Sequence, residues 1–550
     1  MNKKQTPIKI VVLLAVVILI NVLGSKIYER WDLTHDNRYT LSEASEKIIK
    51  NIKDPIQINV YLQGDFPSEF KRLQLESKQL LEEFKSDNSK IHFRFINPTG
   101  HEKDLIQKGL EPSRLQVQED GKISQAIIFP WAIIKYGDKS ENVNLLQTAV
   151  INAEDDQIEN SVQALEYNFL NAIHKITNTK SKKIAILKGN GELNDLYIAD
   201  MLRKVKNYYH LGVFTLDSVQ RNPQKTAKDI QGYDLAIIAK PTEKFTEAEK
   251  YTMDQFIMNG GKTLWMVDNA YAELDSLMQT GEALLYPRDL GLTDLFFNYG
   301  VRINSDVVKD LYGSKILLQT GNTGNKPQFS QFIWPYHPLV LPNGKNSLSK
   351  NTEPVRLRFP NSMDTLKNKD VTKKILLQSS KLSQIVGLPK IISLDELTEK
   401  PDPKKFADEK EKFFGVLLEG KFTSAYNNRV KPFSLENAKD KGIENKMVVI
   451  SDGDFIRNQV QNNQPLSLDS DKWTQERFGN KEFLMNAINY LLDDSGLINI
   501  RSKTVDLKIL DKEKAFKERS KWQIINIVLP LILLAIFGFI FTFIRKKKYQ

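Results

Sequence analysis

The sequence predicts an α/β protein of two domains, flanked by one membrane-spanning helix at each end. Three observations support this fold class. Each end of the chain carries an apolar stretch with basic residues on the side of the nearer terminus. Between these stretches, the first part follows a strand, helix, strand order, and the second part alternates strands with helices. The chain's 550 residues provide room for two to four domains of ordinary size.

The two apolar stretches cover residues 8–24 and 522–544. About 20 mostly apolar residues suffice for a helix to cross a membrane, and Lys and Arg flanks stay on the cytoplasmic side. The first stretch follows Lys3 and Lys4, and Arg545-Lys546-Lys547-Lys548 follows the second. We therefore expect residues 1–7 and 545–550 in the cytoplasm and the main body on the periplasmic, extracytoplasmic side of the inner membrane. A cleaved signal peptide ending near Val22-Leu23-Gly24 is the alternative for the first stretch.

Composition excludes several kinds of chemistry. The chain has no cysteine, so it has no thiol nucleophile, thiolate metal site or redox pair. The formal net charge is +10, but seven of these charges lie in the two membrane flanks, which leaves about +3 for the body. The basicity thus reflects membrane topology, and no nucleic-acid partner is expected.

The first domain is predicted to cover residues 25–177. Thr40 and Glu43 have capping-box spacing at the start of an amphipathic helix. Strands are then expected at 56–62 and 91–96, with a helix over 70–84 between them, and a β-hairpin follows at 126–136 and 142–146. A βαβ unit followed by a hairpin indicates a thioredoxin-like layout, without the redox Cys-x-x-Cys. A helix over 159–177 closes the domain, and the polar linker 178–182 follows it.

The second domain is predicted to cover residues 183–500. Strands are expected at 183–187, 213–216, 235–239 and 263–267, with helices at 195–207 and after a capping box at Thr246 and Glu249. This alternation predicts a doubly wound, amidotransferase-like α/β sheet. Residues 270–440, rich in Pro and Gly, are expected as an irregular insertion. The strand 447–451 and the helix 483–492 then form the last βα unit, and a juxtamembrane segment follows at 501–521.

The turn Gly189-Asn190-Gly191-Glu192 follows a strand, where phosphate-binding loops lie. A dinucleotide fingerprint would need a third glycine at position 194, which is Asn194, so a tight turn at the sheet edge is expected. Gly261-Lys262-Thr263 has the ending of a P-loop, but the first glycine of that motif would be at 256, which is Phe256. We therefore expect no nucleotide cofactor.

Asp452 and Asp454 are the best paired carboxylates, because they follow a strand at the end where sites on such sheets form. Carboxylates in such places also cap helices and close turns, and we favour that interpretation. The sequence has no Gly-x-Ser-x-Gly and no His-Glu-x-x-His motif, so we expect no enzyme, metal or cofactor. The aromatic and proline segment 334–339 is either a contact surface or a packed loop. A ligand or partner surface is expected at the two motifs, which comprise Gly189, Asn190, Gly191, Glu192, Asp452 and Asp454.

The order of several short motifs resembles the GldG family of gliding-associated ABC transporter auxiliary proteins. The motifs are Leu33-Thr34, Tyr39-Thr40-Leu41-Ser42, Val60-Tyr61-Leu62, the Gly-x-Gly-Glu turn, Asp452-Gly453-Asp454-Phe455, and the segment 486–500 running into Arg501. They cover nearly the whole chain. Relatives usually carry Gly-His-Gly-Glu where this chain has Asn190, which puts a ligand role of that histidine in doubt here.

The resemblance implies a substrate-binding-like accessory subunit that works with an ABC permease and a separate cytoplasmic ATPase, in gliding motility or cell-envelope transport. The family's α/β domain is similar to one in intraflagellar transport proteins, the GIFT domain, which favours a binding role. Two alternatives remain open. One is an envelope scaffold that binds peptidoglycan or adhesin machinery without transport, and the other is an envelope hydrolase that uses Asp452 and Asp454.

Overall fold

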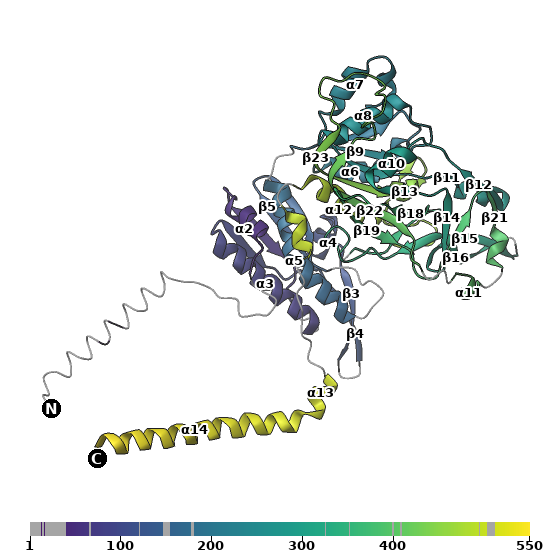
Figure 1. Cartoon of the computed structure of the whole chain (residues 1–550). Coiled ribbons are helices and arrows are strands. Elements are labelled where there is room, and N and C mark those ends of the chain that lie inside the picture. Colours follow the sequence, from purple (N-terminus) through teal and green to yellow (C-terminus); the bar gives the residue numbers. More distant parts are fainter. Residues whose placement is uncertain are drawn as a thin grey trace. The chain divides into compact units, whose positions relative to one another are not determined.

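The structure is a computed structural model of the chain (Figure 1). It describes residues 40–549, together with Leu13 and Val16, apart from gaps at 65–67, 120–121, 147–153, 178–180, 325, 351, 399–400, 407–409, 494–495 and 503–511. The predicted membrane stretch at 8–24 lies almost wholly outside the described residues. The chain forms two compact units, Met1–Lys503 and Thr504–Gln550.

The first part of the larger unit is built around a four-stranded sheet of order β2-β1-β5-β6. β1 pairs parallel with β2 and antiparallel with β5, so the predicted βαβ unit followed by a β-hairpin is present. The elements are α2 (Glu43–Lys50), β1 (Ile56–Val60), α3 (Ser68–Asp87), β2 (Ile91–Phe95), α4 (Glu102–Gln107), β3 (Ser113–Glu119), β4 (Lys122–Ile128), β5 (Trp131–Tyr136), β6 (Lys139–Asn144) and α5 (Glu154–Thr177).

Two local predictions in this part are wrong. The strand predicted at 126–136 is interrupted at Phe129-Pro130, where proline offers no amide donor, and its first half, β4, pairs with β3 instead. The N-cap of α2 is Ser42 and not Thr40. The Ser42 hydroxyl accepts from the Ser45 amide at 3.2 Å, while the Ser42 amide donates to Glu166 of α5.

The second part contains a larger mixed sheet whose parallel strands have the order β8-β7-β9-β10-β23. The predicted capping box of Thr246 and Glu249 is confirmed at the start of α8. The elements are β7 (Lys183–Lys188), α6 (Asp195–Lys206), β8 (His210–Thr215), η1 (Asp217–Gln220), α7 (Pro223–Ile230), β9 (Leu235–Ala239), α8 (Glu247–Met258), β10 (Lys262–Met266), β23 (Lys441–Ile450), η3 (Gly453–Ile456), β24 (Val460–Gln461), β25 (Gln464–Pro465), α12 (Asn480–Leu492) and η4 (Leu497–Ser502).

The central parallel strands are buried on both faces, as covered parallel sheets are. Trp265 of β10 is fully buried in a core cluster that also contains Phe256 of α8. Its neighbours Leu264 and Met266 point to the opposite face of the sheet and are also fully buried. Each strand therefore has a fixed place between packed layers, and its carboxyl end is held rigidly.

The region between β10 and β23, expected to be irregular, is mostly β-structure. β22 extends the large sheet by pairing antiparallel with β23, and β18, β13 and β19 continue it. The segment 334–339 lies in the strand β16, where Trp334 and Tyr336 are fully buried in a second core cluster. The elements are β11 (Ala270–Tyr271), α9 (Leu274–Thr280), β12 (Glu282–Pro287), α10 (Thr293–Tyr299), β13 (Val301–Ile303), β14 (Asp306–Asp310), β15 (Gly313–Thr323), β16 (Lys326–Val340), β17 (Val355–Arg356), β18 (Met363–Thr365), β19 (Val371–Gln378), β20 (Ser383–Gly387), β21 (Lys390–Ser393), η2 (Leu394–Leu397), α11 (Pro403–Phe406) and β22 (Phe413–Thr423).

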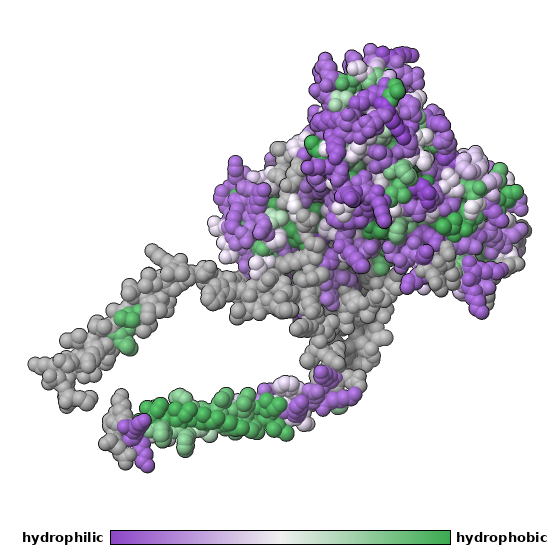
Figure 2. Space-filling model, viewed as in Figure 1, coloured by the Kyte–Doolittle hydropathy of each residue, from purple (hydrophilic) through white to green (hydrophobic). Residues whose placement is uncertain are grey.

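The second unit contains α13 (Lys512–Lys517) and α14 (Arg519–Tyr549). Within the described ranges, the stretch Arg519–Lys547 of α14 alone is long and apolar enough to cross a membrane. Figure 2 shows α14 as a continuous hydrophobic surface that ends in hydrophilic residues. This helix covers the stretch predicted at 522–544.

Candidate functional site

Three neighbouring strands bring charged residues together at one edge of the large sheet. Lys240 directly follows β9, Asp268 lies two residues beyond β10, and Asp452 and Asp454 lie just beyond β23. Because β9, β10 and β23 are adjacent and parallel, their carboxyl ends meet at the same edge. Ligand sites of open α/β sheets form at this edge.

Lys240 is the centre of a buried ion network. Its side chain is 3% exposed, and its Nζ lies 2.6 Å from Asp454 Oδ2, 2.9 Å from Glu273 Oε1 and 3.8 Å from Asp268 Oδ2. Arg457 contacts the other carboxylate oxygen of Asp454 at 3.2 Å. Burial lowers the pKa of Lys240, but the three carboxylates outweigh burial and hold this pKa above its ordinary value. Burial acts in turn to raise the pKa of Asp454, but Lys240 and Arg457 hold it well below its usual range.

The two predicted carboxylates have different environments. Asp452 is fully buried, and its oxygens accept the backbone amides of Asp454 and Arg358, both at 2.8 Å. It is the N-cap of η3, which agrees with the capping interpretation, and burial raises its pKa well above the usual range. Burial also raises the pKa of Asp268 to about 6. Of the pair Asp452 and Asp454, the second lines the cavity described next.

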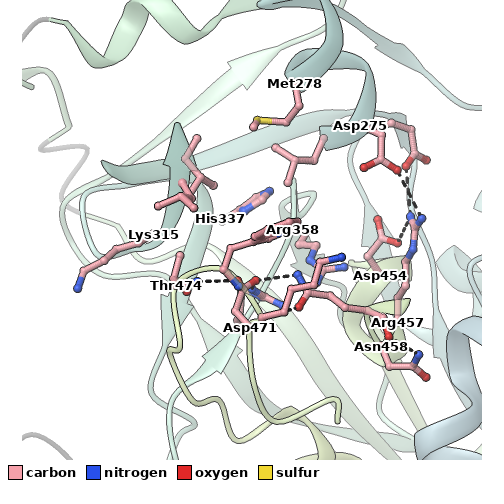
Figure 3. A pocket seen from close by; sticks show the side chains of 18 of the residues that line it. Asp275, Met278, Lys315, His337, Arg358, Asp454, Arg457, Asn458, Asp471 and Thr474 are labelled. Atoms are coloured by element: carbon pink, nitrogen blue, oxygen red, sulfur yellow. Dashed lines mark hydrogen bonds and ion pairs between the residues drawn. The ribbon is translucent and has the colours of Figure 1, made fainter. Parts of the chain in front are cut away.

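A cavity of about 910 Å³ opens beside the ion network. Figure 3 shows Arg457 with Asp454 and Asp275 on one side of it, and Asp471 with Thr474 on another. Its walls come from α9, β15, β16, the segment after β17, and the loop before α12. Much of the lining is apolar, and these residues are Leu274, Met278, Ile316, Leu317, Phe329, Phe359, Val460 and Trp473.

Two residues at this site hold a left-handed backbone conformation that is unfavourable for side chains other than Gly, Asn and Asp. Lys240 has φ 53° and Phe359 has φ 48°. Lys240 is the centre of the ion network, and Phe359 lines the cavity. Such strain persists where the surrounding structure fixes the backbone, and it is concentrated at functional sites.

Two arginines from the segment at β17 face the cavity together with a histidine from β16. Arg356 pairs with Asp471 at 2.7 Å and lies over the ring of Phe478. Burial and the neighbouring charge of Arg358 lower the pKa of Arg356 to about 10. His337 is 2% exposed, and burial lowers its pKa well below the usual range, so its imidazole is neutral. The Nε2 atom of His337 has no hydrogen-bond partner among the described residues.

The predicted turn Gly189-Asn190-Gly191-Glu192 lies at the same sheet edge, beyond β7, but it does not line the cavity. Asn190 is buried, its carbonyl accepts the amides of Thr242 and Glu243, and its side chain donates to Glu249 at 3.2 Å. Gly191 has φ +71°, and a Cβ there would lie 2.1 Å from Thr242 Oγ1. The turn is therefore held tightly against the loop after β9, and of the residues in the two predicted motifs only Asp454 lines the cavity.

Sequence reasoning missed Lys240 and Arg358, and it noted His337 only as part of the segment 334–339. The sequence does mark Lys240 as a candidate site residue, because it is the first polar residue after the wholly apolar strand 235–239. Asp268 and Asp452 have similar positions just after their own strands. Arg358 lies in the region without clean periodicity, where the sequence does not mark it. In the described ranges, no group of three or more His, Asp or Glu side chains is arranged to hold a metal ion.

Among the comparisons with known proteins, a family match agrees with the transport-associated role that the sequence suggested. Residues 35–135 match a domain of unknown function. An uncharacterized protein from Borreliella burgdorferi is 22% identical over 559 residues, and the match covers 100% of this chain and 99% of that protein. A solved structure, the mmIFT52 N-terminal domain, is 13% identical with a TM-score of 0.29, over 57% of this chain and 99% of that one. Residues 181–487, more than half of the chain, match the family described as ABC-type uncharacterized transport system, and the chain belongs to this family.

Proposed function

We propose that this chain is a membrane-anchored, non-catalytic accessory subunit of an ABC-type transport complex, and that its second domain binds a ligand. The family match supports the association with transport. The apolar helix α14 supports the anchor, with a basic cytoplasmic end at Arg545-Lys546-Lys547-Lys548 and the main body outside the cytoplasm.

The observation that carries the ligand-binding role is the cavity at the carboxyl edge of the sheet. Its volume of about 910 Å³ is in the range of ligand pockets, which are commonly 300–1,000 Å³ and mostly apolar with a few placed polar groups. The buried network of Lys240, Asp454 and Glu273 fixes one wall. A rigid, partly strained wall beside an open cavity is the arrangement that a preorganised binding site needs.

The same geometry supports a non-catalytic role. Both oxygens of Asp452 accept backbone amides, and both oxygens of Asp454 pair with cations. Asp452 does not line the cavity, and Asp454 lies between two cations that hold it ionised, so both carboxylates fit a structural role. Because neither nucleotide motif is complete in the sequence, ATP hydrolysis is assigned to a separate cytoplasmic subunit that works with a permease.

The resemblance to gliding-associated auxiliary proteins supports a narrower role in surface gliding or cell-envelope transport. In this proposal, the first domain keeps a thioredoxin-like scaffold without redox chemistry and acts in protein contacts. Its sheet order β2-β1-β5-β6 is compatible with such a scaffold.

Affinity purification of the natively tagged full-length chain in mild detergent, with mass spectrometry, tests this proposal. We expect an ABC permease and its ATPase to be enriched. A variant that ends after Lys517, and so lacks α14, should lose both partners, whereas the cavity variant Trp473→Ala should keep them. Recovery of the full-length chain alone, or with adhesin or peptidoglycan machinery only, would overturn the transport role, and the second result would favour a scaffold.

A further inference from the structure

We propose that the cavity binds a small ligand that joins one acidic group, a carboxylate or phosphate ester, to an apolar or aromatic body, and that Arg358 holds the acidic group. This inference rests on the proposed ligand-binding role and names the chemical class of the ligand. Three features of the cavity carry it: an unmatched cation, a neutral polar group beside that cation, and an apolar mouth.

Arg358 is the unmatched cation. It lines the cavity, yet its guanidinium has no hydrogen-bond or ion-pair partner among the described residues. The nearby acids are already occupied, because Asp454 pairs with Lys240 and Arg457, and Asp471 pairs with Arg356. Asp452 accepts the backbone amide of Arg358 at 2.8 Å. Against the effect of burial, the charge of Arg358 acts to lower the pKa of both Asp452 and Asp454, but its guanidinium forms no ion pair with either carboxylate.

The other cations of the lining have partners. Lys315 lies 3.8 Å from Glu476, and Lys472 donates to the Val460 carbonyl and lies over the ring of Trp473. Arg358 also repels Arg356, which lies two residues away on the same segment and whose pKa it helps to lower. An anion in the cavity would relieve this repulsion and would give the guanidinium its charge-assisted hydrogen bonds.

His337 adds a polar group next to this charge. The pKa of His337 is lowered by burial and then by the charges of Arg358 and Arg356. Figure 3 shows the imidazole and Arg358 in the middle of the cavity lining. A neutral imidazole still carries one N–H donor, so it contributes polarity without adding charge. The ring is held edge-on against Phe359, with centroids 5.1 Å apart.

The mouth of the cavity accounts for the apolar body of the ligand. Trp473 is 60% exposed, Phe329 53% and Met278 43%, although all three are large apolar side chains. Ile316 and Phe359 continue this surface into the buried wall. Exposed aromatic side chains beside a cavity gain most when an apolar partner covers them. Inorganic phosphate would leave this apolar surface exposed to water, and a neutral hydrocarbon would give the Arg358 guanidinium no ion-pair partner.

Isothermal titration calorimetry on the full-length chain in phosphatidylcholine nanodiscs tests the proposal, with empty nanodiscs as the blank. The probes are 2-naphthyl phosphate, 2-naphthoate, 2-naphthol and inorganic phosphate. We expect at least one naphthyl acid to bind at one site per chain, at least tenfold more tightly than 2-naphthol and inorganic phosphate. Preference between the two acids identifies a phosphate ester or a carboxylate as the natural acidic group.

Three variants assign the contacts. Arg358→Gln should weaken binding of the acids by about tenfold to hundredfold and leave 2-naphthol unchanged. Phe329→Ser, at the mouth, should weaken acids and alcohol alike. Arg203→Gln, at an exposed position of α6, is the matched control and should change nothing. The melting temperature of Arg358→Gln should stay within about 2 °C, because the guanidinium has no hydrogen bond or ion pair among the described residues that would be lost.

Equal binding of 2-naphthol and the acids, acid binding that survives Arg358→Gln, or no binding of any probe would overturn the assignment of the ligand class. None of these results would affect the purification experiment, in which the accessory role is tested without any ligand. The failure of one proposal can thus be told from the failure of the other.

Discussion

The substitution Lys240→Met tests whether the buried ion network holds the sheet edge together. It removes the cation that lies 2.6 Å from Asp454 and 2.9 Å from Glu273, and it keeps most of the side-chain volume. Breaking a buried ion pair by removing one partner costs about 3–5 kcal/mol, because it leaves buried charge uncompensated. Arg457, at 3.2 Å from Asp454, remains as a partner of this carboxylate. We therefore expect a loss of free energy of unfolding near the lower end of this range.

This loss of free energy of unfolding should appear as a measurable decrease in the melting temperature. The unfolding entropy is about 2.1 cal/mol/K per residue near 60 °C. For a domain of roughly 300 residues, a loss of about 3–5 kcal/mol in the free energy of unfolding therefore lowers the melting temperature by about 5–8 °C. Intrinsic fluorescence of the full-length chain in mild detergent can follow it, because Trp265 and Trp334 are fully buried in the two core clusters. Lys244→Met, at a side chain that is 64% exposed and paired with Asp289, is the matched control and should shift the melting temperature by less than 1 °C.

The dependence on pH gives a second readout. In the natural chain the pKa of Asp454 is held below its ordinary value, so its ion pairs stabilise the fold above the unfolded pKa near 4 and are lost as the pH falls further. The natural chain therefore keeps these ion pairs between pH 7 and pH 4. In Lys240→Met the buried carboxylates lose their cation, so burial raises their pKa values, and their protonation over this range relieves the destabilisation of the variant. The gap in melting temperature should therefore shrink between pH 7 and pH 4. A gap below 1 °C at pH 7, or a gap that stays constant down to pH 4, would refute the reasoning.

Two further substitutions test the scaffold, and both use the same thermal assay. Gly191→Ala should lower the free energy of unfolding by at least about 2 kcal/mol, because φ is positive there and the added Cβ would also clash with Thr242. Gly281→Ala is the control, since its φ is +78° but the space around it is open, and it should cost only about 1 kcal/mol. Equal losses for the two variants would show that the contact with Thr242 is unimportant. Tyr299→Phe removes the hydroxyl that donates to buried Asp254 at 2.8 Å and should cost about 1–2 kcal/mol, and a loss below 0.5 kcal/mol would contradict this role.

The sequence predicted those parts of the fold where the apolar pattern has a clear period. The strands at 183–187, 235–239 and 263–267 are short apolar runs bounded by turn residues, and all three lie in the large sheet. The βαβ unit of the first domain was predicted for the same reason. The strand pair 326–340 and 313–323 was missed, because it alternates between exposed and buried residues only over part of its length and contains two prolines near its buried end.

The candidate site was only partly predictable, because it is assembled by pairing between distant strands. Asp454 was identified from its place after a strand. Its partner Lys240 lies 214 residues earlier, and nothing in the local pattern of either residue names the other. Arg358 reaches the cavity through a segment whose position depends on β16 and β17. Such contacts follow from the register of whole strands, which a single sequence does not specify locally.

The late return of β23 to the centre of the sheet also has a consequence for chain synthesis. Thr263 of β10 pairs with Met447, so 183 residues must be made between the two partners. At about 5–20 residues per second, β10 waits roughly 10–40 s with one row of amides and carbonyls unpaired. An open edge of this kind is a template for pairing with another nascent chain. The insertion thus places a kinetic demand on the cell, and a chain interrupted before residue 441 would expose β10 as an aggregation-prone edge.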